Sequence, residues 1–312
     1  MPATGSTPRP GSPRGCTPRR RAAAEVERKG WIVVGSGRVG AALCRWLADA
    51  GLPPLAVVGR RRPLALAAGC GAGHAWSLGE WQARLPELAP SSVLVAIPDD
   101  ALAPLAARWA PARPDWRGWA VLHTSGARDA SVFAPLAHRG AAVGSLHPMM
   151  TFPRSARSAP PPANLIFSFE GSPAARRLAA ALVRRWGGIP LQLPPRAKTA
   201  YHLAATLVGP GAVIQMAAAR CILQQAGLRG HPLERALAGL RMLLAATASN
   251  LADGLEAAWT GPLARGDQAT LALHRQTLSS PHLAQLYAAL NRAGRELLPA
   301  PSRKNTTRTI TN

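Results

Sequence analysis

The chain has 312 residues and a net charge of +22, with 37 lysines and arginines against 15 acidic residues. This length suits two domains with a sizeable core. The positive charge is nearly all arginine, scattered along the chain and not concentrated on one helix, so we expect no specific nucleic-acid partner. The four cysteines form no C-x-x-C pair and lie at no zinc-ligand spacing, which predicts a reduced, cytoplasmic protein without a metal site.

The two ends of the chain differ in composition from the rest. Residues 1–29 are rich in Pro, Gly, Ser, Thr and Arg and predict a disordered basic tail, and residues 299–312 predict a second, loose tail. No apolar stretch of the signal-peptide type follows the first arginines. The most apolar segment, Leu203 to Ala219, is interrupted by Gly209-Pro210-Gly211, which predicts a pair of buried helices and no membrane span.

The first predicted element of the folded part is a nucleotide-binding turn. A strand at Trp31–Val34 runs into Gly35-Ser36-Gly37-Arg38-Val39-Gly40, and an amphipathic helix follows. In a dinucleotide-binding βαβ unit the first glycine makes the tight turn, the second lets the backbone approach a pyrophosphate, and the third lets helix pack on strand. The free N–H groups at the helix N-terminus would hold the pyrophosphate.

The second predicted strand, Leu55–Val58, is followed by arginines where an NAD-binding site would carry an acidic residue. The segment after it is Gly59-Arg60-Arg61-Arg62. Arg60 and Arg61 suit the 2′-phosphate of NADP(H), because a hydrogen bond to a charged group contributes about 1.5–3 kcal/mol. We therefore expect NADP(H) in preference to NAD(H). The alternative is that these arginines only reflect the abundance of arginine in the chain.

Short apolar runs alternate with helical segments as far as Pro194, and only helical patterns follow. This alternation predicts a mostly parallel, doubly wound α/β sheet of the Rossmann type, followed by an all-α C-terminal domain. The further predicted strands are Val93–Ile97, Ala120–His123, Ala141–Leu146, Leu165–Phe169 and Leu191–Leu193. The principal predicted helices are Ala101–Trp109, Pro173–Trp186, Ala197–Gly227 with a break at Gly209-Pro210-Gly211, Leu233–Leu251, Asp267–Thr277 and Pro281–Leu297.

Polar side chains follow three of the predicted strands, at the sheet edge where open α/β folds bind ligands. Pro98 and Asp99 are expected to lie against the cofactor, unless Asp99 only caps the next helix. His123, Ser125 and His147 are candidate catalytic residues, because hydride transfer to a carbonyl needs a group that exchanges a proton, and histidine titrates near neutrality. For each histidine the alternative is a structural role, with the ring bonded to the backbone.

Two clusters of polar residues lie in the predicted helical domain. Lys198, Tyr201 and His202 open its first helix, and residues four apart share a helix face. Lys198 is the only lysine between the two tails, which suggests a titratable amine and a catalytic role, with plain surface charge as the alternative. In the second cluster a Gly- and Pro-rich turn presents Arg265 and Asp267. Arg265 suits a substrate carboxylate or phosphate, and Asp267 either fixes Arg265 or caps the next helix.

Taken in order, these motifs resemble the bacterial proteins that join a Rossmann-like NAD(P)-binding domain to domain of unknown function 2520, a group described as short-subunit oxidoreductases of unassigned reaction. The resemblance covers about Trp31 to Leu290. The motifs that carry it are Gly35-Ser36-Gly37-Arg38-Val39-Gly40, Ala96-Ile97-Pro98-Asp99-Asp100, His123-Thr124-Ser125-Gly126, Ser145-Leu146-His147-Pro148-Met149, Tyr201-His202-Leu203-Ala204-Ala205 and Thr260-Gly261-Pro262-Leu263-Ala264-Arg265-Gly266-Asp267.

The two-domain plan is also similar to a superfamily of 6-phosphogluconate dehydrogenases, β-hydroxyacid dehydrogenases and deazaflavin-dependent NADP oxidoreductases. In the β-hydroxyacid enzymes a Lys-x-x-Asn-Asn motif opens the helical domain and supplies the acid/base lysine. Lys198 stands in the similar place, with Tyr201 and His202 where that motif has asparagines. His147-Pro148-Met149 is similar to the motif of prephenate dehydrogenases whose histidine bonds the hydroxyl being oxidised, but the glycine that usually follows is absent here.

These observations predict a Rossmann-like NAD(P)-binding domain at residues 30–195 and a helical domain at 196–298, with the unknown-function region beginning near residue 145. The expected function is that of a cytoplasmic NADP(H)-dependent oxidoreductase. It would transfer hydride to or from a small, anionic hydroxy, carbonyl or imine substrate bound between the domains, and form a homodimer through the helical domain. Two alternatives stay open: a non-catalytic NADP(H)-binding sensor or scaffold, and a prephenate-dehydrogenase-like enzyme.

Overall fold

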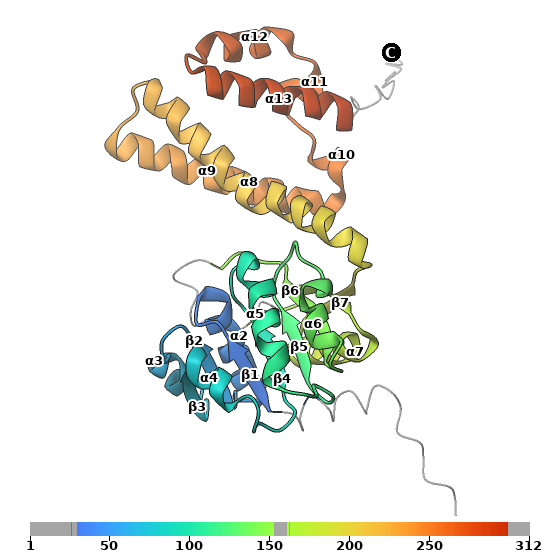
Figure 1. The fold of residues 1–312 in the computed structure, drawn as a ribbon. Coiled ribbons are helices and arrows are strands. Elements are labelled where there is room, and N and C mark those ends of the chain that lie inside the picture. The colour runs from blue at the N-terminus through green and yellow to red at the C-terminus, as the bar shows by residue number, and fades with distance from the viewer. Residues whose placement is uncertain (1–25, 27–29, 153–160, 162, 299–312) are drawn as a thin grey trace, which may run out of the picture. The chain divides into compact units, whose positions relative to one another are not determined.

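The computed structural model describes residues 26, 30–152, 161 and 163–298, and the two predicted tails lie outside these residues apart from position 26. An eight-stranded sheet flanked by helices comes first, and helices alone follow it (Figure 1). Contacts divide the chain into two compact units, residues 1–209 and 210–312.

The sheet has the order β3-β2-β1-β4-β5-β6-β7-β8, and its strands from β3 to β6 are parallel. β7 runs antiparallel to β6, and β8 runs parallel to β7. The predicted α/β class with a mostly parallel sheet is confirmed. The strands are β1 (Trp31–Val34), β2 (Ala56–Gly59), β3 (His74–Ser77), β4 (Ser92–Val95), β5 (Ala120–His123), β6 (Ala142–Pro148), β7 (Ile166–Gly171) and β8 (Ile189–Gln192).

One strand is missing from the sequence-based prediction. It is β3, which pairs with β2 at the edge of the sheet and buries only Trp76. The central strands are easier to predict because a parallel strand covered on both faces is apolar throughout. All four residues of β1, and all four of β2, are buried.

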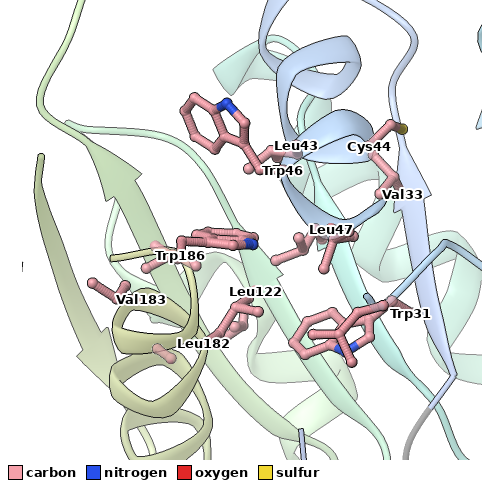
Figure 2. Packing of buried hydrophobic residues seen from close by; sticks show 14 of the residues in the cluster. Trp31, Val33, Leu43, Cys44, Trp46, Leu47, Leu122, Leu182, Val183 and Trp186 are labelled. Atoms are coloured by element: carbon pink, nitrogen blue, oxygen red, sulfur yellow. The ribbon is translucent and has the colours of Figure 1, made fainter. Parts of the chain in front are cut away.

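One face of the sheet packs against α2 (Arg38–Asp49), α3 (Leu64–Gly69) and α7 (Pro173–Arg185). Trp46 of α2 belongs to this cluster, and its ring centroid lies 5.8 Å from that of Phe167 and 5.7 Å from that of Trp186. Figure 2 shows Trp46 and Trp186 with the neighbouring residues of α2 and α7. Leu43 and Leu47 on α2 and Leu182 on α7 extend the same cluster. These leucines recur at helical spacing, so each helix turns one apolar stripe to the sheet.

The other face packs against α4 (Leu78–Arg84), α5 (Leu102–Trp109) and α6 (Ala134–Ala137). Tryptophans dominate this second cluster: Trp81, Trp109, Trp116 and Trp119 are all less than 2% exposed. The strand residues that face them include Val95, Val121 and Val143. Three short 3-10 helices complete this part of the chain, η1 (Asp99–Ala101), η2 (Ala110–Ala112) and η3 (Ala130–Phe133).

Two glycines let β1 join α2 closely. Gly35 has φ +112° and lies against β4, where an added Cβ would come 2.1 Å from the Ala96 carbonyl oxygen. A Cβ on Gly40 would come 1.7 Å from the carbonyl oxygen of Gly35. No side chain fits at either position. Nothing lies within 4 Å of a Cβ added to Gly37, so the second glycine of the turn faces open space.

After β8 and η4 (Pro195–Ala197) the remaining secondary structure is helical. It consists of α8 (Lys198–Gln225), α9 (Gly230–Asn250), η5 (Leu251–Asp253), α10 (Leu255–Ala258), α11 (Pro262–Arg265), α12 (Gln268–Thr277) and α13 (Pro281–Leu297). The predicted helical region is confirmed, and the short helices α10 and α11 add to the predicted ones.

The predicted break in the first long helix is wrong. α8 continues through Gly209-Pro210-Gly211 as one helix of 28 residues. A proline removes one N–H bond from a helix, and the apolar helix-forming residues on both sides offset that loss. The stretch Pro195–Gln225 is long and apolar enough to cross a membrane, and none of its most apolar window is buried. The expected pair of buried helices is therefore a single exposed helix, in which the two compact units meet after Gly209.

Candidate functional site

The predicted nucleotide-binding turn opens α2. Gly37 is the N-cap residue of α2 and has an extended backbone. Because glycine has no side chain, no side-chain group caps the first N–H groups of the helix. Arg38 donates a hydrogen bond to the Phe152 carbonyl oxygen at 2.9 Å. Ser36 lies beside the end of β2, because a Cβ on Gly59 would come 2.9 Å from the Ser36 hydroxyl. The turn, the N-terminal end of α2 and the end of β2 lie together, and we call them the cradle, because a dinucleotide-binding βαβ unit holds the pyrophosphate at this place.

The arginines after β2 differ in their partners. Arg62 forms a two-point hydrogen-bonded ion pair with Glu80, the residue that also completes the capping box of α4. Arg60 and Arg61 are exposed. The two residues predicted to bind a 2′-phosphate are thus exposed to solvent, while the third arginine of the run is occupied by Glu80.

His123, at the end of β5, is fully buried and its two ring nitrogens have partners. Nδ1 accepts a hydrogen bond from the Ser125 backbone N–H at 3.2 Å, and Nε2 lies 3.1 Å from the Asp129 carbonyl oxygen. Burial, assisted by the positive charge of Lys198, lowers the pKa of His123 to about 4. A neutral ring with both nitrogens engaged favours the structural alternative, in which His123 holds the loop after β5.

Ser125 and Asp99 bind each other. The Ser125 hydroxyl donates to Asp99 Oδ2 at 2.8 Å and accepts from the backbone N–H groups of Ala127 and Arg128 at 3.2 Å and 2.9 Å. Asp99 begins η1, whose N-cap residue is Pro98 and which has no side-chain cap. The Asp99 carboxylate therefore ties the loop after β4 to the loop after β5 in place of capping a helix.

The sheet face that is apolar at Val121 and Val143 becomes polar two residues further along each strand, at His123 and Ser145. The register places His123 of β5 beside Ser145 of β6, and Ser145 opposite Glu170 of β7. Next in register, His147 lies opposite Ser168. Side chains at alternate positions share a face, so all of these residues point to the same side. We call Ser145, His147, Ser168 and Glu170 the polar strand face.

The first turns of α8 cover the polar strand face. The ring of His147 lies between those of Tyr201 and His202, with both ring centroids 5.8 Å away and both pairs edge to face. The Thr199 hydroxyl lies 3.4 Å from the Ala127 carbonyl oxygen, which links α8 to the loop after β5. The structure thus brings together His147, Tyr201 and His202, which the sequence predicted from separate motifs.

Lys198, the first residue of α8, is 1% exposed, so the alternative of a surface charge is wrong. Its ammonium group has no hydrogen-bond partner. Burial lowers the pKa of Lys198 to about 8, and the carboxylates of Glu170, Asp129 and Asp99 act in the opposite direction. An amine with a pKa near neutrality, inside a cluster of polar groups, is suited to exchange protons.

The site contains several more buried polar atoms without a partner. A buried polar group that makes no hydrogen bond costs roughly 1–3 kcal/mol, so a cluster of them is typical of a site that binds something. The atoms are Ser145 Oγ, His147 Nδ1, Ser168 Oγ, Glu170 Oε1, Lys198 Nζ and the Tyr201 hydroxyl. The Tyr201 hydroxyl is near Ser168, which opposes the rise in its pKa that burial causes, but no hydrogen bond of ordinary geometry joins them.

Ser168 and Glu170 are absent from the sequence-based candidates. The signal for them was present in the alternation of β7, where Phe167 and Phe169 face the core and Ser168 and Glu170 face the other way. In a strand buried on both faces, a polar residue at every second position is unusual. Recognising it requires knowing that β7 is covered on both sides.

Gly126 has a close-packing role at the same place. A Cβ at this position would come 2.2 Å from Cδ2 of His202 and 2.8 Å from Nε2 of His147. The absence of a side chain at Gly126 lets both rings approach the loop after β5.

Arg265 and Asp267 belong to the second unit. Asp267 caps α12, because its carboxylate accepts from the Thr270 backbone N–H at 3.0 Å and from the Thr270 hydroxyl at 2.7 Å. These bonds lower the pKa of Asp267. Arg265 ends α11 and is exposed. The capping alternative for Asp267 is therefore confirmed, and Arg265 has its guanidinium at the surface of this unit.

Two family models match the chain. Residues 82–148 match a Rossmann-like domain, and residues 165–293 match the domain of unknown function 2520. The resemblance inferred from the motifs is confirmed: the chain joins a Rossmann-like domain to a domain of unknown function 2520. No curated protein matches it.

Solved structures with the same fold include oxidoreductases. A candidate NADP oxidoreductase from Bacteroides fragilis is 22% identical, with a TM-score of 0.68 over 87% of this chain and 99% of that one. A protein from Thermotoga maritima is 20% identical, with a TM-score of 0.62 over 86% and 97% of the two chains. A reductive aminase from Aspergillus terreus, in complex with NADPH and ethyl levulinate, is 17% identical, with a TM-score of 0.55 over 86% and 94%. These likenesses establish a shared fold.

The lowered pKa of the partly buried His147 makes the stability of this protein fall in acid. Burial lowers the pKa of His147 from 6.5 to about 4, with Lys198 and His202 acting in the same direction. Between these values the unfolded chain binds a proton that the folded chain does not, so stability falls as the pH falls from about 6.5 to about 4. We expect His147→Gln to reduce this loss by about 2 kcal/mol, measured by urea unfolding at about pH 7 and about pH 4.5.

The matched control for this measurement is His138→Gln, which changes an exposed histidine after α6. It should leave the difference in unfolding free energy between the two pH values as in the unaltered chain. An unchanged pH dependence in His147→Gln would contradict the lowered pKa of His147.

Proposed function

We propose that this chain is a cytoplasmic NADP(H)-dependent oxidoreductase that transfers hydride to or from a small hydroxy, carbonyl or imine compound, with Lys198 exchanging the proton. The observation that carries the proposal is the buried Lys198, whose ammonium group lies unpartnered over the polar strand face of a Rossmann-like sheet. Lysine is an efficient proton donor where its pKa is close to the working pH, and that of Lys198 is about 8.

The cradle at the start of α2 supports binding of the cofactor. Open space at Gly37, the first N–H groups of α2 and the exposed Arg60 and Arg61 provide room, donors and positive charge for a phosphorylated dinucleotide. Pro98 and Asp99, at the end of the neighbouring strand, would border its reactive end. The cofactor, when bound, supplies the hydride. The reductive aminase that shares this fold was solved with NADPH, which favours the same nucleotide here.

The residues around Lys198 would bind and orient the substrate. A pKa of about 4 keeps the His147 ring neutral near pH 7, so His147 is better suited to accept or donate a hydrogen bond than to supply a proton. Tyr201 and His202, whose rings contact His147, would orient the substrate oxygen or nitrogen. Ser125 and His123 would hold the loop after β5 in place. Arg265 would bind an anionic group of the substrate, with its α12 neighbour Asp267 fixing the turn.

The preference for NADPH can be tested by thermal shift. Ligand binding to the folded state raises the melting temperature, so NADPH should raise it more than NADH at equal concentration. Replacing Arg60 by Asp and Arg61 by Ala should abolish the difference, because each contact to a phosphate is worth about ten- to hundredfold in affinity. Arg62→Ala, which removes the partner of Glu80, is the matched control and should keep the preference. If neither nucleotide shifts the melting temperature, the proposal fails.

The role of Lys198 can be tested by turnover. NADPH oxidation should be followed with a panel of 2-oxo acids, cyclic imines and ketones supplied with an amine, and the reverse reaction with hydroxy acids, prephenate and arogenate. For any active substrate, Lys198→Met should lower kcat on the order of 10²–10⁴-fold while the NADPH-induced thermal shift persists. Lys304→Met, a lysine in the C-terminal tail, is the control. Binding without turnover of any compound would favour the sensor, and turnover undiminished in Lys198→Met would exclude the proton role.

We also propose that the chain forms a homodimer through the exposed apolar side of α8. Leu203, Leu207, Val208, Val213 and Ile214 are 59–76% exposed, and no Asp, Glu, Lys or Arg lies between Lys198 and Arg220. An exposed apolar patch on this scale marks an interaction surface. A second copy is the simplest occupant, because the same exposed apolar residues of α8 on the partner are complementary by symmetry.

A charged substitution on this stripe tests the dimer. We expect the unaltered chain to sediment as a dimer, and Leu207→Glu combined with Ile214→Glu to give monomers, because buried carboxylates without partners disfavour the interface. Arg275→Glu on α12 changes the net charge by the same amount at an exposed position and should remain dimeric. A monomeric unaltered chain, or one that binds phospholipid vesicles through this stripe, would contradict the proposal.

A further inference from the structure

Glu170 is the acidic member of the polar strand face, and the roles assigned so far do not use it. Its side chain is 2% exposed, and its Oε1 atom has no hydrogen-bond partner. It lies opposite Ser145, whose hydroxyl is also buried and unpartnered. A carboxylate is costly to bury, so its presence here needs a compensating positive charge nearby.

Lys198 is the cation on which Glu170 acts, and both side chains are buried with a polar atom that has no hydrogen-bond partner. Of the acidic groups that act on Lys198, Glu170 has the largest effect, followed by Asp129 before η3 and Asp99 in η1. Two of these carboxylates already have hydrogen-bond donors, because Asp129 accepts from Ser131 and Asp99 accepts from Ser125. Glu170 is therefore the acidic group that retains an unpartnered, buried oxygen on the side of Lys198.

The other groups facing Lys198 are histidines, His123 on β5 and His147 on β6. Both rings are neutral near pH 7, because burial and the charge of Lys198 lower each pKa to about 4. They offer no charge that would compensate the ammonium group. Tyr201 and His202 follow Lys198 on α8 itself. Among the described residues around Lys198, the compensation depends on the three carboxylates.

We propose that Glu170 is a positioning residue that keeps the ammonium group of Lys198 charged and directed at the polar strand face beside His147. Glu170 does not need to touch the substrate. It fixes where the proton on Lys198 is held and how readily the amine gives it up. This inference rests on the proposed function, in which Lys198 is the proton-exchanging group, but its test reads the lysine directly and does not require a substrate.

The experiment is an NMR titration of lysine side chains. The chain contains three lysines, Lys29, Lys198 and Lys304, so protein labelled with ¹³C at lysine Cε gives three signals, and Lys198→Met assigns the one in question. In the unaltered chain the Lys198 signal should titrate near the expected pKa of about 8. Glu170→Gln keeps the shape of the side chain and removes its charge. In this variant the Lys198 signal should titrate at about 7 or lower, because a nearby opposite charge changes a pKa by about one or more.

Glu170→Asp and Glu87→Gln complete the design. Glu170→Asp keeps the charge and should give a midpoint between those of the unaltered chain and Glu170→Gln, and this second variant also serves if the Gln variant does not fold. Glu87→Gln changes an exposed carboxylate and should leave the Lys198 midpoint unchanged. A Lys198 midpoint that is the same in both Glu170 variants as in the unaltered chain would overturn the inference.

The outcome is separable from that of the proposed function. If a substrate is found, the pH at which turnover falls on the alkaline side should move down with the Lys198 midpoint in Glu170→Gln and be restored in part by Glu170→Asp. A moved midpoint without any turnover would support Glu170 and count against the oxidoreductase. Turnover that depends on Lys198 but not on Glu170 would support the oxidoreductase and count against the role of Glu170.

Discussion

Burial of one ammonium group over the β6–β7 pair is the constraint on which the arrangement of this site depends. Lys198 begins α8 and is almost wholly removed from solvent, so the sheet beneath it has to supply polar groups where the rest of its surface supplies valine. β6 and β7 do this with serine, histidine and glutamate. Removing a charge from water costs several kcal/mol even after relaxation. Among the described residues, no direct ion pair with Lys198 offsets this cost.

The antiparallel step between β6 and β7 makes this arrangement possible. In the parallel part of the sheet, the polar residue nearest the site is His123, at the carboxyl end of β5. Because β7 runs the other way, its interior residues Ser168 and Glu170 lie opposite His147 and Ser145 in the second half of β6. Polar groups can then lie behind the edge of the sheet, where water is excluded and each charge acts more strongly on its neighbours.

The sequence predicts most of the fold and about half of the site, for physical reasons that differ. Central strands such as β1 are apolar throughout and carry their own signal, whereas β3 buries a single tryptophan and carries none. Lys198 stands out as a solitary lysine, but its burial depends on what α8 packs against. Glu170 leaves a signal in the alternation of β7, but a glutamate in an apolar strand is informative only when the pairing of that strand is known.

The unbroken α8 joins the candidate site to the proposed dimer surface. Its first turns carry Lys198, Tyr201 and His202, which pack on the sheet, and five large apolar side chains between Leu203 and Ile214 are exposed. The candidate site and the proposed dimer surface therefore share one continuous helix of 28 residues. Lys198 at its start is buried and unpartnered, and the exposed apolar residues begin within two turns of it, so a buried charge and exposed apolar surface, which both cost free energy in an isolated chain, are concentrated in the same element.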